Sequence, residues 1–314
     1  MRNKRKLPCF IMASCSCILL ALILSCVSSA DKIVQAAASI DELTSVDNKL
    51  IWLKANAESN SNYVFEVNGS ERIRGGDGTF TPVSNTNLSY KDKTNITITI
   101  RGVGSNAELL PRDSRQFIVD SGVTLILENI VIRGPGTNTS FLTGRSGAPL
   151  ITISSGGTLV MNDGSVITGN DNPGSGGGVY ISNGGKFLMN GGLITNNRAS
   201  ITTAIMGVMD VAYGGGVYVS VGGTFTKTGG IITGYASDQS NGNVVWILND
   251  SDPYRAPFME PAGNSHGHAV YAQTGQLSGI FIRNAGSRRK ERTADPNDNL
   301  HIGSDGTFSG NWDY

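Results

Sequence analysis

Short apolar runs, separated by glycine, asparagine and serine, fill most of the chain after residue 58. A helical spacing of apolar residues occurs only before that point, between Ile40 and Ala57. We therefore predict a short N-terminal capping helix within residues 39–58, with Asp41 as its N-cap. Its apolar side would consist of Leu43, Leu50, Ile51 and Leu53.

The apolar runs recur as a unit of three strands. The first run, at residues 156–162, returns at 184–190 and 222–228. A second run follows each copy after a turn, at 165–168, 193–195 and 231–233. A third run comes later in each unit, at 178–181, 216–219 and 268–271. A more degenerate unit covers residues 123–153, and residues 95–100 and 117–119 predict earlier strands.

A unit this short cannot bury its own apolar face. Parallel stacking of equivalent strands solves this problem, because each strand then pairs with its counterpart one repeat away. We therefore predict an all-β protein. Its fold would be a right-handed parallel β-helix solenoid over residues 59–285, with a polar C-terminal segment and end cap over 286–314. A propeller would need longer antiparallel strands joined by hairpin turns.

Stacking also predicts which side chains meet and which point inward. Met161 should meet Met189, and Asn162 should meet Asn190, because they hold equivalent positions. In the third run, valines and tyrosines must point to opposite faces, since strand side chains alternate. We expect the valines inside; the two columns are Val179, Val217 and Val270, and Tyr180, Tyr218 and Tyr271.

Composition supports this interpretation through glycine. Glycine accounts for 41 of the 314 residues, and 21 of these lie within residues 156–234, largely as pairs between runs. Corners between short strands need positive φ angles, which glycine adopts without steric cost. The glycine excess is therefore explained by the corners of a stacked repeat.

One corner of the repeat varies in length far more than the others. Between the second and third runs lie residues 134–149, 169–177, 196–215 and 234–267, so these loops should line one edge of the stack. One-sided insertions in repeat proteins are commonly the binding face. The candidate binding residues at this edge are Tyr235, Trp246, Asp250, Asp252, Tyr254, Phe258, His266 and His268.

Aromatic side chains flanked by acids can stack on sugars or anchor a protein partner. An equally weighted alternative is that residues 244–248 form an extra strand and the aromatic residues cover the end of the stack. His266 and His268 would share one face of a strand. Without a third ligand nearby, however, we predict neither a metal site nor a cofactor.

The N-terminus predicts export. The chain has 25 basic and 25 acidic residues, but residues 1–25 hold four basic residues and no acid. This basic start and the apolar run that follows it are typical of a signal peptide over residues 1–25. Removing the segment leaves 21 basic against 25 acidic residues, so the body is mildly acidic and nucleic acid is not an expected partner.

All four cysteines lie at or before Cys26, which excludes a disulfide framework from the body. Residues 22–26, Leu-Ile-Leu-Ser-Cys, resemble a bacterial lipobox, in which the cysteine is lipidated. We predict a lipidated Cys26 and a tether over residues 26–38, which would hold the protein on a membrane at the outer membrane or cell surface. Ordinary cleavage after Ala30, giving a secreted protein, and an uncleaved anchor are alternatives.

The repeat also carries a family resemblance. Residues 156–162 (Gly-Gly-Thr-Leu-Val-Met-Asn), 163–170 and 176–180 (Gly-Gly-Gly-Val-Tyr) resemble right-handed parallel β-helix proteins of the pectate-lyase-like superfamily. They look most like glycine-rich repeat proteins of bacterial surfaces. Residues 187–190 (Phe-Leu-Met-Asn) and 214–218 are similar to repeats of polymorphic outer-membrane proteins, which act as adhesins. Over residues 94–284, the resemblance implies the fold and a role in adhesion.

Many proteins of that superfamily cleave acidic polysaccharides with paired carboxylates. This chain has no Asp-Asp pair, and Asp163 stands alone because its counterparts are Gly191 and Gly229. Arg198 is a candidate base, but a solvated charge is the simpler interpretation. We therefore expect a monomeric, non-catalytic protein that binds a glycan or a surface protein. A polysaccharide lyase or glycoside hydrolase, and a purely structural envelope protein, are the alternatives.

Overall fold

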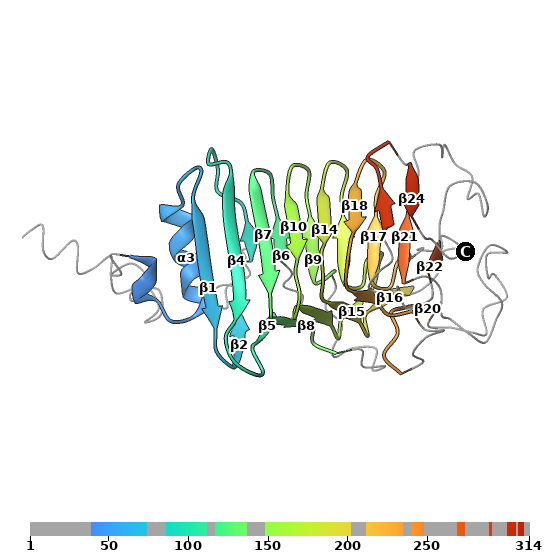
Figure 1. Ribbon diagram of the computed structural model, residues 1–314, viewed down its shortest axis with the longest axis horizontal. Helices are drawn as coiled ribbons and strands as arrows, with labels where there is room; N and C mark the ends of the chain where they lie inside the picture. The colour runs from blue at the N-terminus through green and yellow to red at the C-terminus, as the bar shows by residue number, and fades with distance from the viewer. Residues whose placement is uncertain are drawn as a thin grey trace, which may run out of the picture.

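The computed structural model describes residues 39–73, 86–111, 117–136, 148–201, 212–234, 240–247, 269–273, 289–290, 300–305 and 307–310. Over these residues the protein is all-β, with many short strands in mostly parallel sheets (Figure 1). The predicted all-β class and parallel pairing are therefore confirmed.

Within the described residues the strands form four sheets, which we call A to D. Sheet A contains β1 (Asn62–Val67), β4 (Ile96–Gly102), β7 (Val123–Glu128), β10 (Thr158–Met161), β14 (Lys186–Met189), β18 (Thr224–Lys227), β23 (Leu300–Ile302) and β24 (Phe308–Gly310). Sheet B contains β2 (Ser70–Ile73), β5 (Glu108–Pro111), β8 (Val131–Arg133), β11 (Val166–Thr168), β15 (Leu193–Thr195) and β19 (Ile231–Ile232).

Sheet C contains β3 (Asn87–Leu88), β6 (Phe117–Val119), β9 (Ile151–Ile153), β13 (Val179–Ile181), β17 (Val217–Val219), β21 (Val270–Ala272) and β22 (Arg289–Lys290). Sheet D contains β12 (Asp171–Asn172), β16 (Arg198–Ile201) and β20 (Val244–Ile247). From β1 to β21 the chain visits sheets A, B and C in turn, and in the later repeats it passes through sheet D between B and C. Each strand thus pairs in parallel with its counterpart one repeat away.

The register of these strands confirms the predicted ladders. Met161 lies opposite Met189 across β10 and β14, and Asn190 Nδ2 donates to Asn162 Oδ1 at 3.1 Å. The valine column also points inward as expected, since Val179, Val217 and Val270 are completely buried. Parallel stacking of identical positions therefore builds one continuous apolar core from units that could not form a core alone.

The N-terminal end of the stack is covered by a helix. A 3-10 turn, η2 (Ile40–Glu42), precedes α3 (Val46–Asn56), whose buried residues are Val46, Leu50 and Leu53. The N-cap of α3 is Ser45, whose side chain accepts from Asn48 N, so the prediction of Asp41 was wrong. The helix begins five residues after Asp41, because residues 40–42 close a separate 3-10 turn first.

Helix α3 is tied to the first strands of the stack. Glu71 Oε2 in β2 accepts from Val46 N at 2.9 Å, and Lys54 Nζ donates to the carbonyl oxygens of Asn87 and Ser89 beside β3. Strands β1, β2, β3 and β5 lie within the range predicted for the solenoid, residues 59–285, but the sequence pattern did not locate them individually. The sequence pattern did not locate them because their apolar runs do not repeat the residues of the later units.

At the C-terminal end the pairing reverses direction. Strand β23 runs antiparallel to β18, and β22 runs antiparallel to β21, at the red end of the stack in Figure 1. Lys227 is completely buried and faces Leu300 of β23. It ends an inward column whose other members are Phe65, Ile100, Leu127, Met161 and Met189. The parallel stack therefore ends where the chain folds back on itself.

Candidate binding site

The structure places few of the predicted binding residues. Tyr235, Asp250, Asp252, Tyr254, Phe258, His266 and His268 lie outside the described residues, as does Cys26. Trp246 belongs to β20, where its backbone pairs with that of Ser200; its side chain lies outside the described part. The alternative that residues 244–248 form an extra strand is confirmed for Val244–Ile247.

That extra strand belongs to sheet D, which the sequence did not predict as a sheet. Sheet D occupies the corner between sheets B and C, where the loops vary in length. We call this the loop corner. Asp171 in β12 is almost completely buried; it accepts from Ser200 Oγ and lies 3.6 Å from Arg198 Nη1. The interpretation of Arg198 as a solvated charge was therefore wrong, because its guanidinium is largely buried beside a carboxylate.

A row of buried asparagines fixes the loop corner. Asn170, Asn197 and Asn243 occupy equivalent positions in three repeats and are completely buried. Asn197 Oδ1 accepts from Asn170 N at 3.3 Å, and Asn243 Oδ1 accepts from Asn197 N at 3.1 Å. Asn197 Nδ2 also donates to the carbonyl oxygens of Ile167 and Thr195, at 3.0 and 2.9 Å. Each amide therefore satisfies backbone groups that leave strand pairing at the corner.

The asparagine row ends at a proline. Arg133 pairs with Thr168, which places Pro135 opposite Asn170. Proline has no backbone N–H, so it cannot donate to Asn170 Oδ1 as Asn170 donates to Asn197. Asn170 Oδ1 is accordingly buried with no hydrogen-bond partner among the described residues.

Four tyrosines gather on the outer face of sheet C beside the loop corner. We call Tyr180, Tyr213, Tyr218 and Tyr271 the tyrosine cluster. Tyr180, Tyr218 and Tyr271 pair in register on β13, β17 and β21, while Tyr213 comes from the loop corner before β17. The ring centroids are separated by 5.0 Å (Tyr180–Tyr218), 5.9 Å (Tyr218–Tyr271) and 4.3 Å (Tyr213–Tyr271), all in stacked orientations.

Burial within the cluster is uneven. Tyr218 is 7% exposed and its hydroxyl donates to Gln273 Oε1 at 2.7 Å, whereas Tyr180, Tyr213 and Tyr271 are half-buried. Burial raises the pKa of the Tyr213 and Tyr218 hydroxyls far above the ordinary tyrosine value, and the neighbouring tyrosines add to that rise. Both phenols therefore stay protonated and uncharged at neutral pH.

Glycine lets the chain approach the base of the cluster. A Cβ added at Gly176 would lie 3.1 Å from the Cβ of Tyr180, and one at Gly214 would lie 3.1 Å from the Cα of Tyr218. Both glycines also have positive φ angles, 74° and 64°. The sequence analysis found the tyrosine column but missed Tyr213, although its position directly before Gly214-Gly215-Gly216 was a signal for it.

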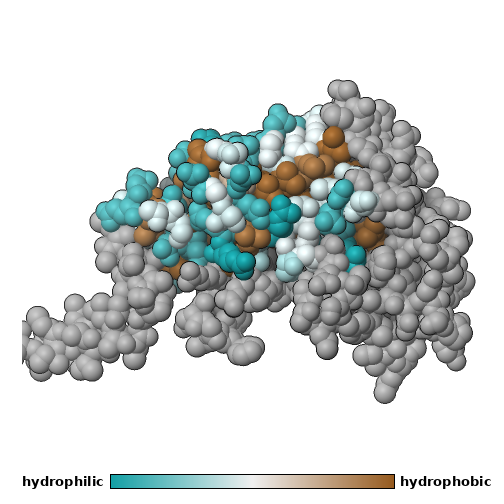
Figure 2. Space-filling view, turned by 90° about the horizontal axis from the view of Figure 1, so that it is seen from below, coloured by the Kyte–Doolittle hydropathy of each residue, from teal (hydrophilic) through white to brown (hydrophobic). Residues whose placement is uncertain are grey.

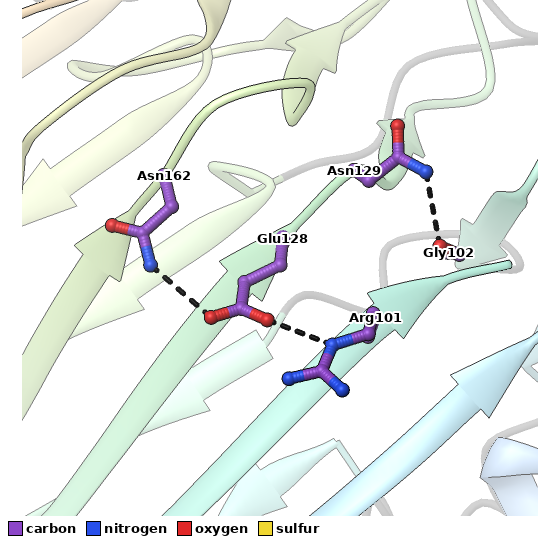
Figure 3. Close-up of polar contacts among 5 residues, drawn as sticks. All are labelled: Arg101, Gly102, Glu128, Asn129 and Asn162. Carbon is purple, nitrogen blue, oxygen red and sulfur yellow. Dashed lines mark hydrogen bonds and ion pairs between the residues drawn. The ribbon is translucent and has the colours of Figure 1, made fainter.

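The carboxylate of Glu128, on the outer face of sheet A, is engaged in polar contacts. Figure 3 shows Glu128 accepting from Arg101 Nε at 2.9 Å and from Asn162 Nδ2 at 3.3 Å, while Asn129 donates to the Gly102 carbonyl. Asp163 lies beside Gly191, whose added Cβ would fall 1.9 Å from Asp163 Oδ1, so the predicted break in the carboxylate column is confirmed. Glu128 thus links the side chains of neighbouring repeats on sheet A.

The outer face of sheet B has a different character. Val131, Val166, Leu193 and Ile231 are in register on four successive strands and are half-buried. Figure 2, seen from below, shows brown apolar residues gathered among polar ones on this side of the molecule. The stack therefore presents an aliphatic row on sheet B and an aromatic row on sheet C.

The chain matches no protein-family model, no curated protein and no solved structure. In the part that the structure describes, no group of three or more His, Cys, Asp or Glu side chains is arranged to hold a metal ion. Nor is any helix of the described ranges long and apolar enough to cross a membrane.

Proposed function

We propose that this protein is an exported, lipid-anchored binding protein that contacts a glycan or a surface protein through its loop corner and the tyrosine cluster beside it. The scaffold in this proposal is a right-handed parallel β-helix, attached to the outer membrane or cell surface through Cys26. The observation that carries the proposal is the stacking of four tyrosine rings from successive repeats next to the variable loops.

The physical argument rests on preorganisation. The tyrosines are held by strand register and by one another, so little side-chain entropy is lost when a ligand binds. Tyrosine supplies apolar area together with a polar group, and such residues are enriched at recognition surfaces. The carboxylates of Glu128 and Asp171 support the scaffold instead, since they pair with Arg101 and Arg198.

A binding panel tests the proposal. The full chain would be applied to arrays of glycans and extracellular-matrix proteins, beside a variant lacking residues 236–264 and the double variant Tyr213→Ala, Tyr271→Ala. We expect specific binding that is lost in both variants. Binding that is unchanged in both would refute the assignment of this surface. Release of unsaturated or reducing ends from polygalacturonate, with or without calcium, would instead favour a polysaccharide lyase or hydrolase.

The anchor is tested separately. Palmitate labelling of the chain expressed in a bacterial host should disappear in Cys26→Ser. Labelling that persists in this variant would show that Cys26 is not the lipidated residue.

A further inference from the structure

We propose that a small pocket at the C-terminal end of the stack binds the acetamido group of an N-acetylated sugar. This inference rests on the proposed binding function and names one chemical group that the glycan ligand would carry. It follows from a break in the hydrogen bonding between the turns that connect sheet C to sheet A.

These turns bond to one another from repeat to repeat. Gly122 N donates to Gly156 O at 3.2 Å, and Gly156 N donates to Gly184 O at 3.0 Å. Gly184 N in turn donates to Gly222 O at 3.0 Å. Each of these N–H groups therefore points along the stack toward the following repeat. The described part of the chain holds no further turn beyond Gly222, and no carbonyl in that part accepts from Gly222 N.

A pocket of about 70 Å³ lies against this last turn. It is lined by residues 220–223 of the turn, by Gln273 and by residues 302–305, where β23 turns toward β24. The β23–β24 hairpin lies beside β18 at the end of the stack (Figure 1). A cavity needs about 10–15 Å³ to hold one water molecule, so the pocket has room for a group of about four or five non-hydrogen atoms.

Gln273 gives the pocket a second donor. Its Oε1 accepts from Tyr218 OH at 2.7 Å, which ties the side chain to the tyrosine cluster. Its Nε2 donates to none of the described residues. Glutamine N–H groups and the backbone N–H of Gly222 can both donate to a carbonyl oxygen. The pocket therefore offers two donors to an oxygen atom of a ligand.

Asp305 supplies an acceptor. Its Oδ1 accepts from Thr307 N at 3.0 Å and from Thr307 Oγ1 at 2.7 Å. These hydrogen bonds hold the pKa of the Asp305 carboxyl below its ordinary value, so the group is ionised at neutral pH. A negative charge in the pocket disfavours an anionic ligand and favours a neutral ligand that carries an N–H group.

Val221 gives the pocket an apolar side. The residues at its position in the three preceding turns are polar: Ser121, Ser155 and Asn183. Val221 is 36% exposed and is one of three exposed large hydrophobic side chains among the described residues. Ligand pockets combine apolar side chains with a few placed polar groups, and Val221 completes such a set here.

An acetamido group matches all three kinds of contact. Its carbonyl oxygen would accept from Gly222 N and Gln273 Nε2, its N–H would donate to Asp305, and its methyl group would contact Val221. The group has four non-hydrogen atoms and fills the pocket by itself. No room is left for the aliphatic stem of an acetylated lysine, whereas the ring of a sugar can remain outside. A sugar is therefore the better ligand.

Matched ligands and variants test this pocket. The full chain would be titrated by calorimetry with triacetylchitotriose and with cellotriose, which has hydroxyls in place of the acetamido groups. We expect the parent to bind triacetylchitotriose about tenfold more tightly than cellotriose, because only the former fills the pocket. Gln273→Glu keeps an acceptor for Tyr218 but removes the donor, so its affinity for triacetylchitotriose should fall about tenfold.

Val221→Ser installs the residue of two earlier turns and removes the apolar contact, so the affinity should fall about fivefold. Val64→Ser is the matched control and should bind as the parent does. Val64 is also an exposed valine, at 49%, but it lies on β1 at the opposite end of the stack (Figure 1).

The outcomes separate the pocket from the general function. Equal affinity of the parent for the two trisaccharides would overturn the acetamido assignment and leave glycan binding intact. Unchanged affinity in both Gln273→Glu and Val221→Ser would overturn the pocket as the site. Tighter binding of a peptide with an acetylated lysine would overturn the sugar as the ligand. A parent that binds neither trisaccharide but binds a matrix protein would overturn this inference and leave the proposed binding function standing. Circular dichroism of each variant would show whether lost affinity reflects lost structure.

Discussion

The repeat closes its two principal corners by different physical means. Between sheets C and A the chain turns tightly, and we call this the glycine corner. Its turns are closed by local backbone bonds, such as Gly185 N to Ser182 O at 2.9 Å, and its glycines have nearly the same φ, with 75° at Gly184 and 78° at Gly222. The loop corner is closed by asparagine side chains that bond from one repeat to the next.

The difference explains where the chain tolerates insertions. A local turn of fixed geometry leaves no room for extra residues. At the loop corner, each buried amide fixes the exit of one strand, and the residues after it can leave the stack before returning at sheet C. The loops and the tyrosine cluster therefore share one corner, while the opposite corner keeps the repeats in register.

The largest expected effect comes from breaking the asparagine row. Asn197→Ala removes the partner of Ile167 O, Thr195 O and Asn170 N, all inside the stack. We expect the free energy of unfolding to fall by about 3–5 kcal/mol, because several buried polar groups lose their bonds and a cavity forms. Chemical denaturation would measure the change.

Two asparagines serve as controls for Asn197→Ala. Asn190 also bonds across repeats but lies on the exposed face of sheet A, so Asn190→Ala should cost no more than about 0.5 kcal/mol. Asn170→Ala should fall between the two, because Asn170 Oδ1 has no partner to lose among the described residues. Equal losses at all three positions would contradict the distinct role of the loop corner.

A smaller loss is expected at the glycine corner. Gly222 has φ of 78°, and an added Cβ would lie 2.4 Å from Asn183 Oδ1. We expect Gly222→Ala to lower the free energy of unfolding by about 1–2 kcal/mol, since the left-handed conformation is costly for other residues. Gly174→Ala is the control, because the nearest atoms to its added Cβ lie at an ordinary 3.6 Å. If both substitutions have the same effect, the backbone conformation is not what the glycine corner requires.

The tyrosine cluster makes the stability of the fold depend on pH in the alkaline range. It does not make stability depend on pH near neutrality. The folded state raises the pKa of Tyr213 and Tyr218, whereas an unfolded tyrosine ionises near pH 10. The contribution of these two phenols to the free energy of unfolding is therefore complete below about pH 10. It is lost as the pH rises above that value, because only the phenols of the unfolded chain ionise there.

Denaturation curves at pH 8 and pH 11 would measure this loss of stability. Tyr218→Phe removes one of the phenols that titrate and should make the decrease between the two pH values smaller. An equal decrease in the parent and in Tyr218→Phe would show that the cluster does not cause it.

The repeat ladders could be predicted because identical positions in a stack must meet. Met161 with Met189 and the inward valines needed only the repeat pattern and the alternation of strand side chains. Sheet D could not be predicted in this way, because β12 spans only Asp171–Asn172 and carries no apolar period. Tyr213 was missed for a related reason, since it lies in a loop whose length hides its equivalence to Ser175.

The sequence by itself determined the all-β class, the parallel pairing of repeats and the use of glycine at the corners, since these follow from short-range spacing and backbone sterics. Only the tertiary structure decided which polar residues are buried and which rings meet. The amides of Asn170 and Asn197, the Asp171–Arg198 pair and the tyrosine cluster depend on contacts between repeats about 27–55 residues apart. The roles of these side chains depend on how deeply they are buried and on which side chains lie next to them. Spacing along the chain does not encode either property.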